Sequence, residues 1–173
     1  VMAKAITLFK IFARQKYKPN EILFEMNNDL NETNPTGTFI TSIVGKYNIK
    51  SDLVELSNAG HQPALQRIGD DFKEFPSSSM PLAVTRHKDA NVYNLENFKL
   101  NGGRIYCFTD GFSECLDDNR QEIGIDGVKE LIVKHQNPSL KRELENSTEE
   151  IRLKSLKKES IEKGIKENND ILD

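Results

Sequence analysis

The spacing of apolar residues changes twice along this chain, and this change limits the fold more than any single motif does. Apolar residues recur every three or four positions in residues 2–13 and again in residues 22–30, which predicts two amphipathic helices. In residues 38–108, short runs rich in β-branched residues alternate with turn formers, which predicts antiparallel strands. Helical spacing returns in residues 128–132. Helices on both sides of a strand-rich middle predict a layered α+β domain.

Length, charge and cysteine content narrow the class of protein. The chain has 173 residues, enough for one sizeable core, and a formal net charge of −3. Basic residues are interleaved with acidic ones, so we expect no nucleic-acid partner. Cys107 and Cys115 form neither a disulfide framework nor a metal-ligand pattern. No apolar run approaches the roughly 18 residues that a membrane span needs. Together these features predict a cytoplasmic protein.

The two ends of the chain suggest a piece of a longer protein. The sequence begins at Val1, directly in a helical pattern that no capping residue precedes. We therefore expect a sensor or receiver domain upstream of it. Near the other end, residues 139–167 are dense in Lys and Glu with thinly spaced apolar residues, which predicts solvated helices.

The segment "FTDGFSE", residues 108–114, carries the strongest candidate site. It follows an unbroken apolar run, "IYCF", that is typical of a central buried strand. A carboxylate at the mouth of such a strand loses solvation, so Asp110 needs either hydrogen bonds or a positive partner. Two interpretations stay open. Asp110 and Gly111 form a turn in which the aspartate bonds its own backbone, or Asp110 binds a hard divalent cation through oxygen.

Six segments carry a resemblance to a known family. They are "GTFITSIVGKYN", "LVELSNAGHQPALQ", "MPLAV", "GGRIYCFTDGFSE", "IGIDGVKELI" and a closing "NNDI". In this order and spacing the chain resembles the SpoIIE/RsbU-like serine phosphatases, the bacterial branch of the metal-dependent protein phosphatase 2C (PPM) group. The resemblance implies a four-layer αββα sandwich, here without its first strands. It also implies that residues 1–173 form a single phosphatase domain, with its last strand incomplete.

The same resemblance implies a metal site. Members of the family hold two Mn²⁺ or Mg²⁺ ions with aspartates at one edge of the sandwich, where a metal-bound water attacks the phosphate directly. By position in the motifs, Asp110 and Asp170 correspond to ligands, and Gly111 permits the tight turn beside the first. The closing motif departs from the family pattern, since Asn169 precedes Asp170 and Leu172 follows Ile171.

A second departure bears on activity. The family carries an early aspartate-glycine motif, whose carboxylate bridges both ions, ahead of the helix with which this chain begins. Without it we expect weak metal binding and a weakly active or inactive fragment. The implied reaction is removal of phosphate from serine or threonine of a regulatory phosphoprotein, such as an anti-sigma-factor antagonist of the STAS type. The alternative is a non-catalytic interaction module with the same fold.

Other candidates are open to plainer explanations. His61 in "NAGHQP" is either a proton donor or part of a structural turn, and the neighbouring Asn and Gly favour the turn. Glu114 either orients a water near an ion or begins an exposed turn. Arg67 and Arg86 have the geometry to grip phosphate but lie in no supporting motif. A sandwich that lacks strands leaves an unpaired edge, so a homodimer is also expected.

Overall fold

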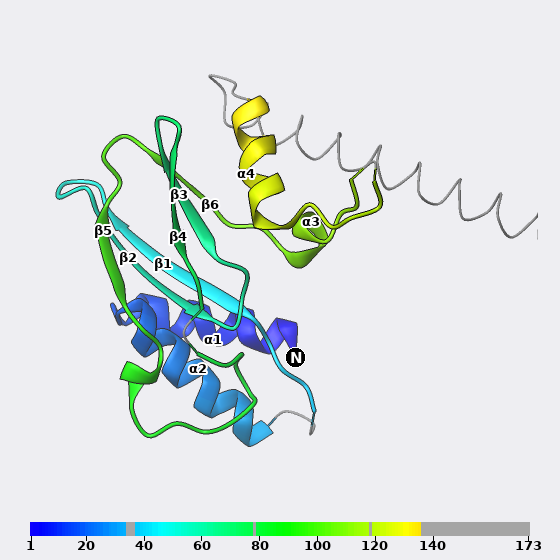
Figure 1. Ribbon diagram of the computed structural model, residues 1–173. Helices are drawn as coiled ribbons and strands as arrows, with labels where there is room; N and C mark the ends of the chain where they lie inside the picture. Colours follow the sequence, from blue (N-terminus) through cyan, green and yellow to red (C-terminus); the bar gives the residue numbers. More distant parts are fainter. Residues whose placement is uncertain (34–36, 78, 118, 136–173) are drawn as a thin grey trace, which may run out of the picture. The chain divides into compact units, whose positions relative to one another are not determined.

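The computed structural model describes residues 1–33, 37–77, 79–117 and 119–135. The chain divides into two compact units, Val1–Phe108 (unit 1) and Thr109–Asp173 (unit 2), whose elements are labelled in Figure 1. A single domain across residues 1–173 stays a prediction.

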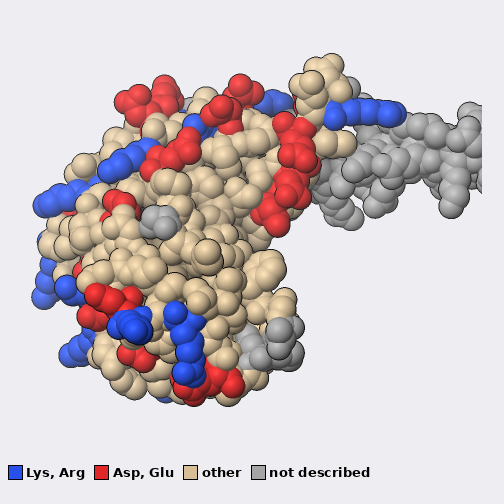
Figure 2. Space-filling view, turned by 60° about the horizontal axis from the view of Figure 1, so that its bottom comes forward, with Lys and Arg blue, Asp and Glu red and all other residues tan. Residues whose placement is uncertain are grey.

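Two helices open unit 1, as the sequence predicts. They are α1 (Met2–Arg14) and α2 (Pro19–Thr33). Ala5 and Leu8, three positions apart on one face of α1, are buried in the cluster that α2 also lines. At the start of α2, the Glu21 carboxylate accepts a hydrogen bond of 2.7 Å from the backbone N–H of Lys18. Basic and acidic side chains are interspersed on the face shown in Figure 2, in agreement with the mixed charge pattern of the sequence.

Unit 1 contains two three-stranded antiparallel sheets. The first has the order β1-β2-β5, with β1 at Ser42–Asn48, β2 at Leu53–Ala59 and β5 at Glu96–Lys99. The second has the order β4-β3-β6, with β3 at Ala64–Ile68, β4 at Asp71–Phe75 and β6 at Arg104–Tyr106. A short 3₁₀ turn, η1 (Ala90–Val92), precedes β5. The predicted antiparallel strands are therefore confirmed.

The core of unit 1 lies in two layers, one on each face of the first sheet. Val44 of β1 and Ala59 of β2 belong to the cluster formed with α1 and α2. Val54 and Leu56 of β2 belong to a second cluster with residues of the other sheet, among them Phe75, whose ring stacks on Phe98 at 4.2 Å between centroids. Helices, sheet and sheet thus follow one another, which is the α+β arrangement of a PPM-like fold.

The predicted central strand at residues 105–108 is wrong in its place and length. β6 ends at Tyr106 and is the last strand in its sheet order. Ile105 packs against the cluster between the sheets and Tyr106 is buried, whereas Cys107 is exposed. Partial cover of Ile105 and burial of Tyr106 thus occur in a strand that has a neighbour on one side only in the described sheet.

A buried asparagine of α2 holds the loop that follows β4. Asn27 is fully buried, and its Oδ1 accepts a 3.0 Å hydrogen bond from the N–H of Ala83. Its Nδ2 donates to the carbonyl of Thr85 at 2.9 Å. Ala83 has a φ of 67°, which is unfavourable for alanine, so the two bonds hold a strained loop in place. Within that loop Leu82 is fully buried, whereas Met80 and Val84 are exposed.

The "NAGH" segment forms a tight turn at the end of β2. The Asn58 Oδ1 accepts a 2.9 Å hydrogen bond from the N–H of His61, and its Nδ2 donates to the carbonyls of His61 and Gln62. Gly60 has a φ of 64°, and a Cβ at this position would lie 2.5 Å from Cγ of Pro81. The turn therefore requires glycine both for its backbone angle and for its contact with the proline loop.

Unit 2 has two described helices, α3 (Asp110–Ser113) and α4 (Gly124–Lys134). Val128, Leu131 and Ile132 are buried on one face of α4, which confirms the predicted helix. Across the ranges that the structure describes, no helix is long and apolar enough to cross a membrane.

Tyr93 places a polar hydroxyl group in the core cluster that contains α1 and α2. Its side chain is fully buried, and its hydroxyl has no hydrogen-bond partner among the described residues, although the ring meets His87 edge-on at 5.6 Å. We expect Tyr93→Phe to leave the free energy of unfolding unchanged or to raise it by about 1 kcal/mol, because an unsatisfied buried hydroxyl is removed. Urea unfolding at neutral pH measures this change.

The pH dependence of the free energy of unfolding of the same variant is a second test. Burial raises the pKa of Tyr93 above its ordinary value of 10.0. The folded state therefore holds the phenolic proton more tightly than the unfolded state does, and stability is lost as the pH rises above 10.0. Tyr93→Phe should lose less stability in this range. A Tyr93→Phe variant that is less stable than the native chain would contradict the assignment.

Gly60 gives a direct test of the turn after β2. We expect Gly60→Ala to lower the free energy of unfolding by about 2–4 kcal/mol, because it combines a positive φ with overlap against Pro81. Gly45→Ala is the matched control, since its φ is not positive and the nearest atom to an added Cβ is the Glu55 carbonyl at 3.8 Å. The control should change stability by no more than about 0.5 kcal/mol. Equal losses in the two variants would refute the packing argument.

Candidate functional site

Asp110 begins the short helix α3 of unit 2. Its side chain is exposed, and its Oδ1 accepts a 2.8 Å hydrogen bond from the N–H of Gly111. The Asp110 carbonyl accepts bonds from the N–H of Glu114 at 2.8 Å and from the Ser113 hydroxyl at 3.2 Å. One helical turn thus fixes the position of the carboxylate and leaves it open to solvent.

The electrostatic part of the sequence argument is corrected by this geometry. The sequence predicts a carboxylate at the mouth of a buried strand, where loss of solvation demands a positive partner. Asp110 instead lies beyond the end of β6, at the exposed start of α3, so its charge stays solvated. The hydrogen bond to Gly111 is the one that the turn interpretation requires. The charge of Asp110 is therefore compatible with the fold whether or not an ion binds.

Gly111 has a different role from the predicted one. It is a residue of α3 and does not have a positive φ. An added Cβ would meet only Oγ1 of Thr109, at 3.9 Å. Neither a left-handed backbone nor a close contact requires glycine at this position. Glu114 is the exposed residue that ends α3, which agrees with the plainer of its two interpretations.

A complete metal centre is not formed by the residues that the structure describes. Among them, no three His, Cys, Asp or Glu side chains come together. Asp110 offers the oxygen ligand that Mn²⁺ and Mg²⁺ prefer, but as a single carboxylate it does not fit a two-ion site alone. Asp170, the other predicted ligand, lies outside the described residues. The described residues therefore supply one of the two predicted ligands.

His61 has a structural position. Its ring is half-buried, and its Nδ1 lies 3.1 Å from the hydroxyl of Thr41, just before β1. Its backbone N–H is held by Asn58 in the turn described above. These contacts join the turn after β2 to the start of β1, as expected for a residue that shapes the turn.

The two arginines that could grip phosphate are engaged in other contacts. The buried Arg67 side chain donates from Nε to the carbonyl of Gly69 at 2.7 Å and pairs with Asp70 at 3.1 Å. Arg86 pairs with Glu32 of α2. Arg67 therefore supports the β3–β4 hairpin. Arg86 connects α2 to the loop after β4 that contains Pro81.

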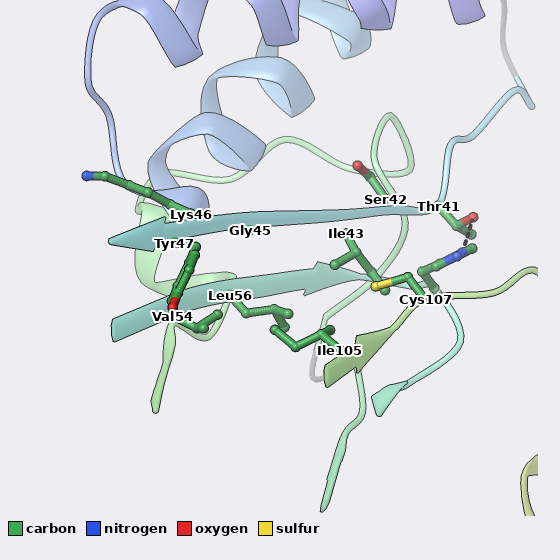
Figure 3. Close-up of a pocket in the computed structure, with 11 residues that line it drawn as sticks. Thr41, Ser42, Ile43, Gly45, Lys46, Tyr47, Val54, Leu56, Ile105 and Cys107 are labelled. Carbon is green, nitrogen blue, oxygen red and sulfur yellow. Dashed lines mark hydrogen bonds between the residues drawn. The ribbon is translucent and has the colours of Figure 1, made fainter. Parts of the chain in front are cut away.

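An open groove between the two sheets is a feature that the sequence analysis missed. It has a volume of about 460 Å³ and runs along β1 toward β6 (Figure 3). Its apolar lining includes Ile43, Tyr47, Val54, Leu56 and Ile105. The sequence did contain an indication of this face. Ile43, Gly45 and Tyr47 are alternate residues of β1 and therefore lie on the same face of the strand.

Cys107 lies at the end of this groove near the Thr41–His61 pair (Figure 3). Although the residue as a whole is exposed, partial burial of its thiol raises the pKa of that group above the ordinary value. The thiol is therefore protonated at neutral pH and is a poor nucleophile.

Comparison with known proteins identifies the family. The model of the family "Stage II sporulation protein E (SpoIIE)" matches residues 1–162. The phosphoserine phosphatase RsbU of Bacillus subtilis (strain 168) is 24% identical over 103 residues, which are 58% of this chain and 30% of that protein. This chain thus matches less than a third of the length of that relative, and no solved structure gives a significant match. Because the family model covers nearly the whole sequence and the described strands and helices have the expected order, the chain belongs to the SpoIIE family.

Proposed function

We propose that this chain is part of a metal-dependent serine/threonine phosphatase that acts on a regulatory phosphoprotein in bacterial signalling. The family match over residues 1–162 carries the proposal. The relative RsbU is named as a phosphoserine phosphatase, and the two "NAGH" and "FTDG" segments of this chain lie in an ordered turn and an exposed helix start. Phosphoester hydrolysis of this kind relies on bound ions and needs no protein nucleophile.

The proposed metals are Mn²⁺ or Mg²⁺, with Asp110 and Asp170 as two of the ligands. An exposed carboxylate held by one helical turn suits an oxygen-binding cation. One described carboxylate is too few for tight binding of a divalent ion, so we infer that the 173-residue chain by itself is weakly active. The full ligand set would then include acidic groups of the longer protein.

The proposed biological setting follows from the family. The substrate would be a phosphoserine of a partner protein, such as an anti-sigma-factor antagonist of the STAS type. A sensor or receiver domain upstream would control the phosphatase, and the protein would act in the cytoplasm. Support for a phosphoserine substrate comes from the similarity to RsbU, which is named as a phosphoserine phosphatase.

A non-catalytic role is the second candidate. The observation in its favour is that the described part of the chain gathers no three potential ligands in one place. In that case the sandwich would serve as a docking surface for a phosphoprotein, and Asp110 would be an ordinary helix-start residue. The two candidate functions differ in one property: a phosphatase would hydrolyse a phosphoserine peptide in the presence of a divalent ion, and a docking domain would not.

The decisive experiment compares two aspartate variants in hydrolysis of a phosphoserine peptide. With Mn²⁺ present, we expect slow release of phosphate by the native chain and a decrease on the order of 100-fold in Asp110→Asn, because even residues that only support a metal ligand are worth 10–100-fold. Asp126→Asn is the matched control, since Asp126 is also acidic in the first turn of a helix of unit 2. It should keep the native rate.

Calorimetric titration of Mn²⁺ into the same three proteins supplies a readout that does not depend on turnover. Asp110→Asn should bind Mn²⁺ more weakly than the native chain and than Asp126→Asn. Native activity that persists in excess chelator, or equal losses in both variants, would overturn the metal assignment. Absence of hydrolysis at any Mn²⁺ concentration, together with binding of the phosphopeptide, would favour the docking role.

A further inference from the structure

The loop that joins β4 to η1 is held by contacts at successive residues of its backbone. Leu82 is fully buried and exchanges two backbone hydrogen bonds with Ile40, at 3.1 and 2.8 Å. The preceding residue, Pro81, lies against Gly60 in the turn after β2. The following residue is bonded to α2 through the amide of Asn27. The course of residues 81–83 is therefore fixed from both sides.

Ala83 has a backbone conformation that is unfavourable for alanine. Its φ is 67°, and Asn27 bonds both its N–H and the carbonyl of Thr85. Asn31, one turn further along α2, also donates to the Thr85 carbonyl, at 3.1 Å. Such strain persists only where the surrounding structure imposes it, and it is concentrated at sites that bind or react. The loop is therefore a candidate for a functional surface.

The fixed backbone carries two apolar side chains at the surface. Met80 is 57% exposed and Val84 is 49% exposed, and each is two residues from the buried Leu82. Both stay at the surface because the bonds of Leu82 and Ala83 fix the backbone to which they are attached. Apolar side chains on a fixed loop can bind another molecule without the entropic cost of ordering that loop.

Basic side chains follow the apolar ones in the same loop. Arg86 and Lys88 come two and four positions after Val84, and both are exposed. Arg86 pairs with Glu32 of α2, but each side chain of the pair is 59% exposed. An ion pair in contact with water contributes little, so Arg86 can exchange Glu32 for another anion. Apolar and basic side chains together are complementary to a segment that carries apolar and acidic ones.

We propose that residues 80–88 dock the substrate through an apolar and acidic segment next to its phosphoserine. The inference rests on the proposed function, because the docked molecule is taken to be the phosphoprotein substrate. Met80 and Val84 bury apolar side chains of that segment, and Arg86 and Lys88 pair with its carboxylates. The phosphate is left for the metal site, so docking needs neither an ion nor the phosphate.

The test is direct binding of fluorescent peptides, measured by anisotropy in excess chelator. The first peptide carries a phosphoserine, two leucines and two glutamates, with each glutamate two positions from a leucine, because Val84 and Arg86 are two positions apart. In the second peptide serine replaces leucine, in the third glutamine replaces glutamate, and the fourth is the first without its phosphate. We expect the first and fourth peptides to bind equally and the other two to bind about three- to tenfold more weakly.

Variants of the chain test the apolar contact. Val84→Ser should weaken binding of the first peptide about fivefold, because less apolar surface is buried on docking. Ile6→Ser on α1 is the matched control, since Ile6 is also 49% exposed and belongs to the other apolar surface, with Met2 and Phe9. It should leave binding unchanged. Met80→Ser replaces Val84→Ser if circular dichroism shows that the latter has lost structure.

The pair of Arg86 and Glu32 separates docking from a structural role. Arg86→Gln should weaken binding of the first peptide about threefold, because a cation that meets the peptide is removed. Glu32→Gln should strengthen binding about twofold, because Arg86 loses its competing partner. If the pair only held the loop on α2, both variants would weaken binding. Lys50→Gln, in the turn between β1 and β2, removes an exposed charge elsewhere and should have no effect.

Four results would overturn the proposal. They are equal affinity for the first and second peptides, equal losses in Val84→Ser and Ile6→Ser, weaker binding in both Arg86→Gln and Glu32→Gln, and no saturable binding of the first peptide below about 1 mM. Binding that needs both Mn²⁺ and the phosphate would also overturn it, but would support the phosphatase. Conversely, docking in chelator by a chain that never hydrolyses the phosphopeptide would leave the loop assignment intact and refute the phosphatase.

Discussion

The first sheet of unit 1 is covered on both faces, and the rest of the unit depends on this double burial. β2 is its central strand, and Val54 and Leu56 point to the layer between the sheets while Ala59 joins the layer under the helices. Burial of each such side chain is worth about 1.5–3 kcal/mol. Since a shift of one residue would exchange the two faces, the register of β1 and β5 on β2 determines which residues reach the groove and which reach the helices.

Buried side-chain amides connect this sheet to the segments that carry the family motifs. The Asn58 side chain bonds three backbone groups of the turn after β2, and the Asn27 side chain bonds two, the Ala83 N–H and the Thr85 carbonyl, in the loop after β4. Both side chains are buried, so each lost bond would leave a polar group without solvent. The irregular segments are therefore held as rigidly as the strands are, and Gly60 against Pro81 brings the two into contact.

The periodicity of the sequence was sufficient to predict the helices and the antiparallel strands, because one buried face leaves a repeating signal in both. It failed at Ile105 and Tyr106, because an apolar run does not show whether a strand has neighbours on one side or on both, and β6 is the last strand in the order of its described sheet. It also missed the groove, since a groove depends on how residues of the two sheets come together in space, and no local pattern encodes that. The family motifs indicated Asp110 but not its exposure, which is set by where β6 ends.

Because Asp110 is exposed, the segment that carries it does not need a bound metal ion in order to fold. A buried carboxylate would need an ion to fold, and removal of the ion would then unfold the site. Asp110 is solvated and bonded to Gly111, so the turn that holds it can form without an ion. Affinity for Mn²⁺ or Mg²⁺ would then come from how many other carboxylates reach the same point, and not from relief of a buried charge. On this argument, loss of an ion from Asp110 would change affinity and activity without unfolding the turn that carries the carboxylate.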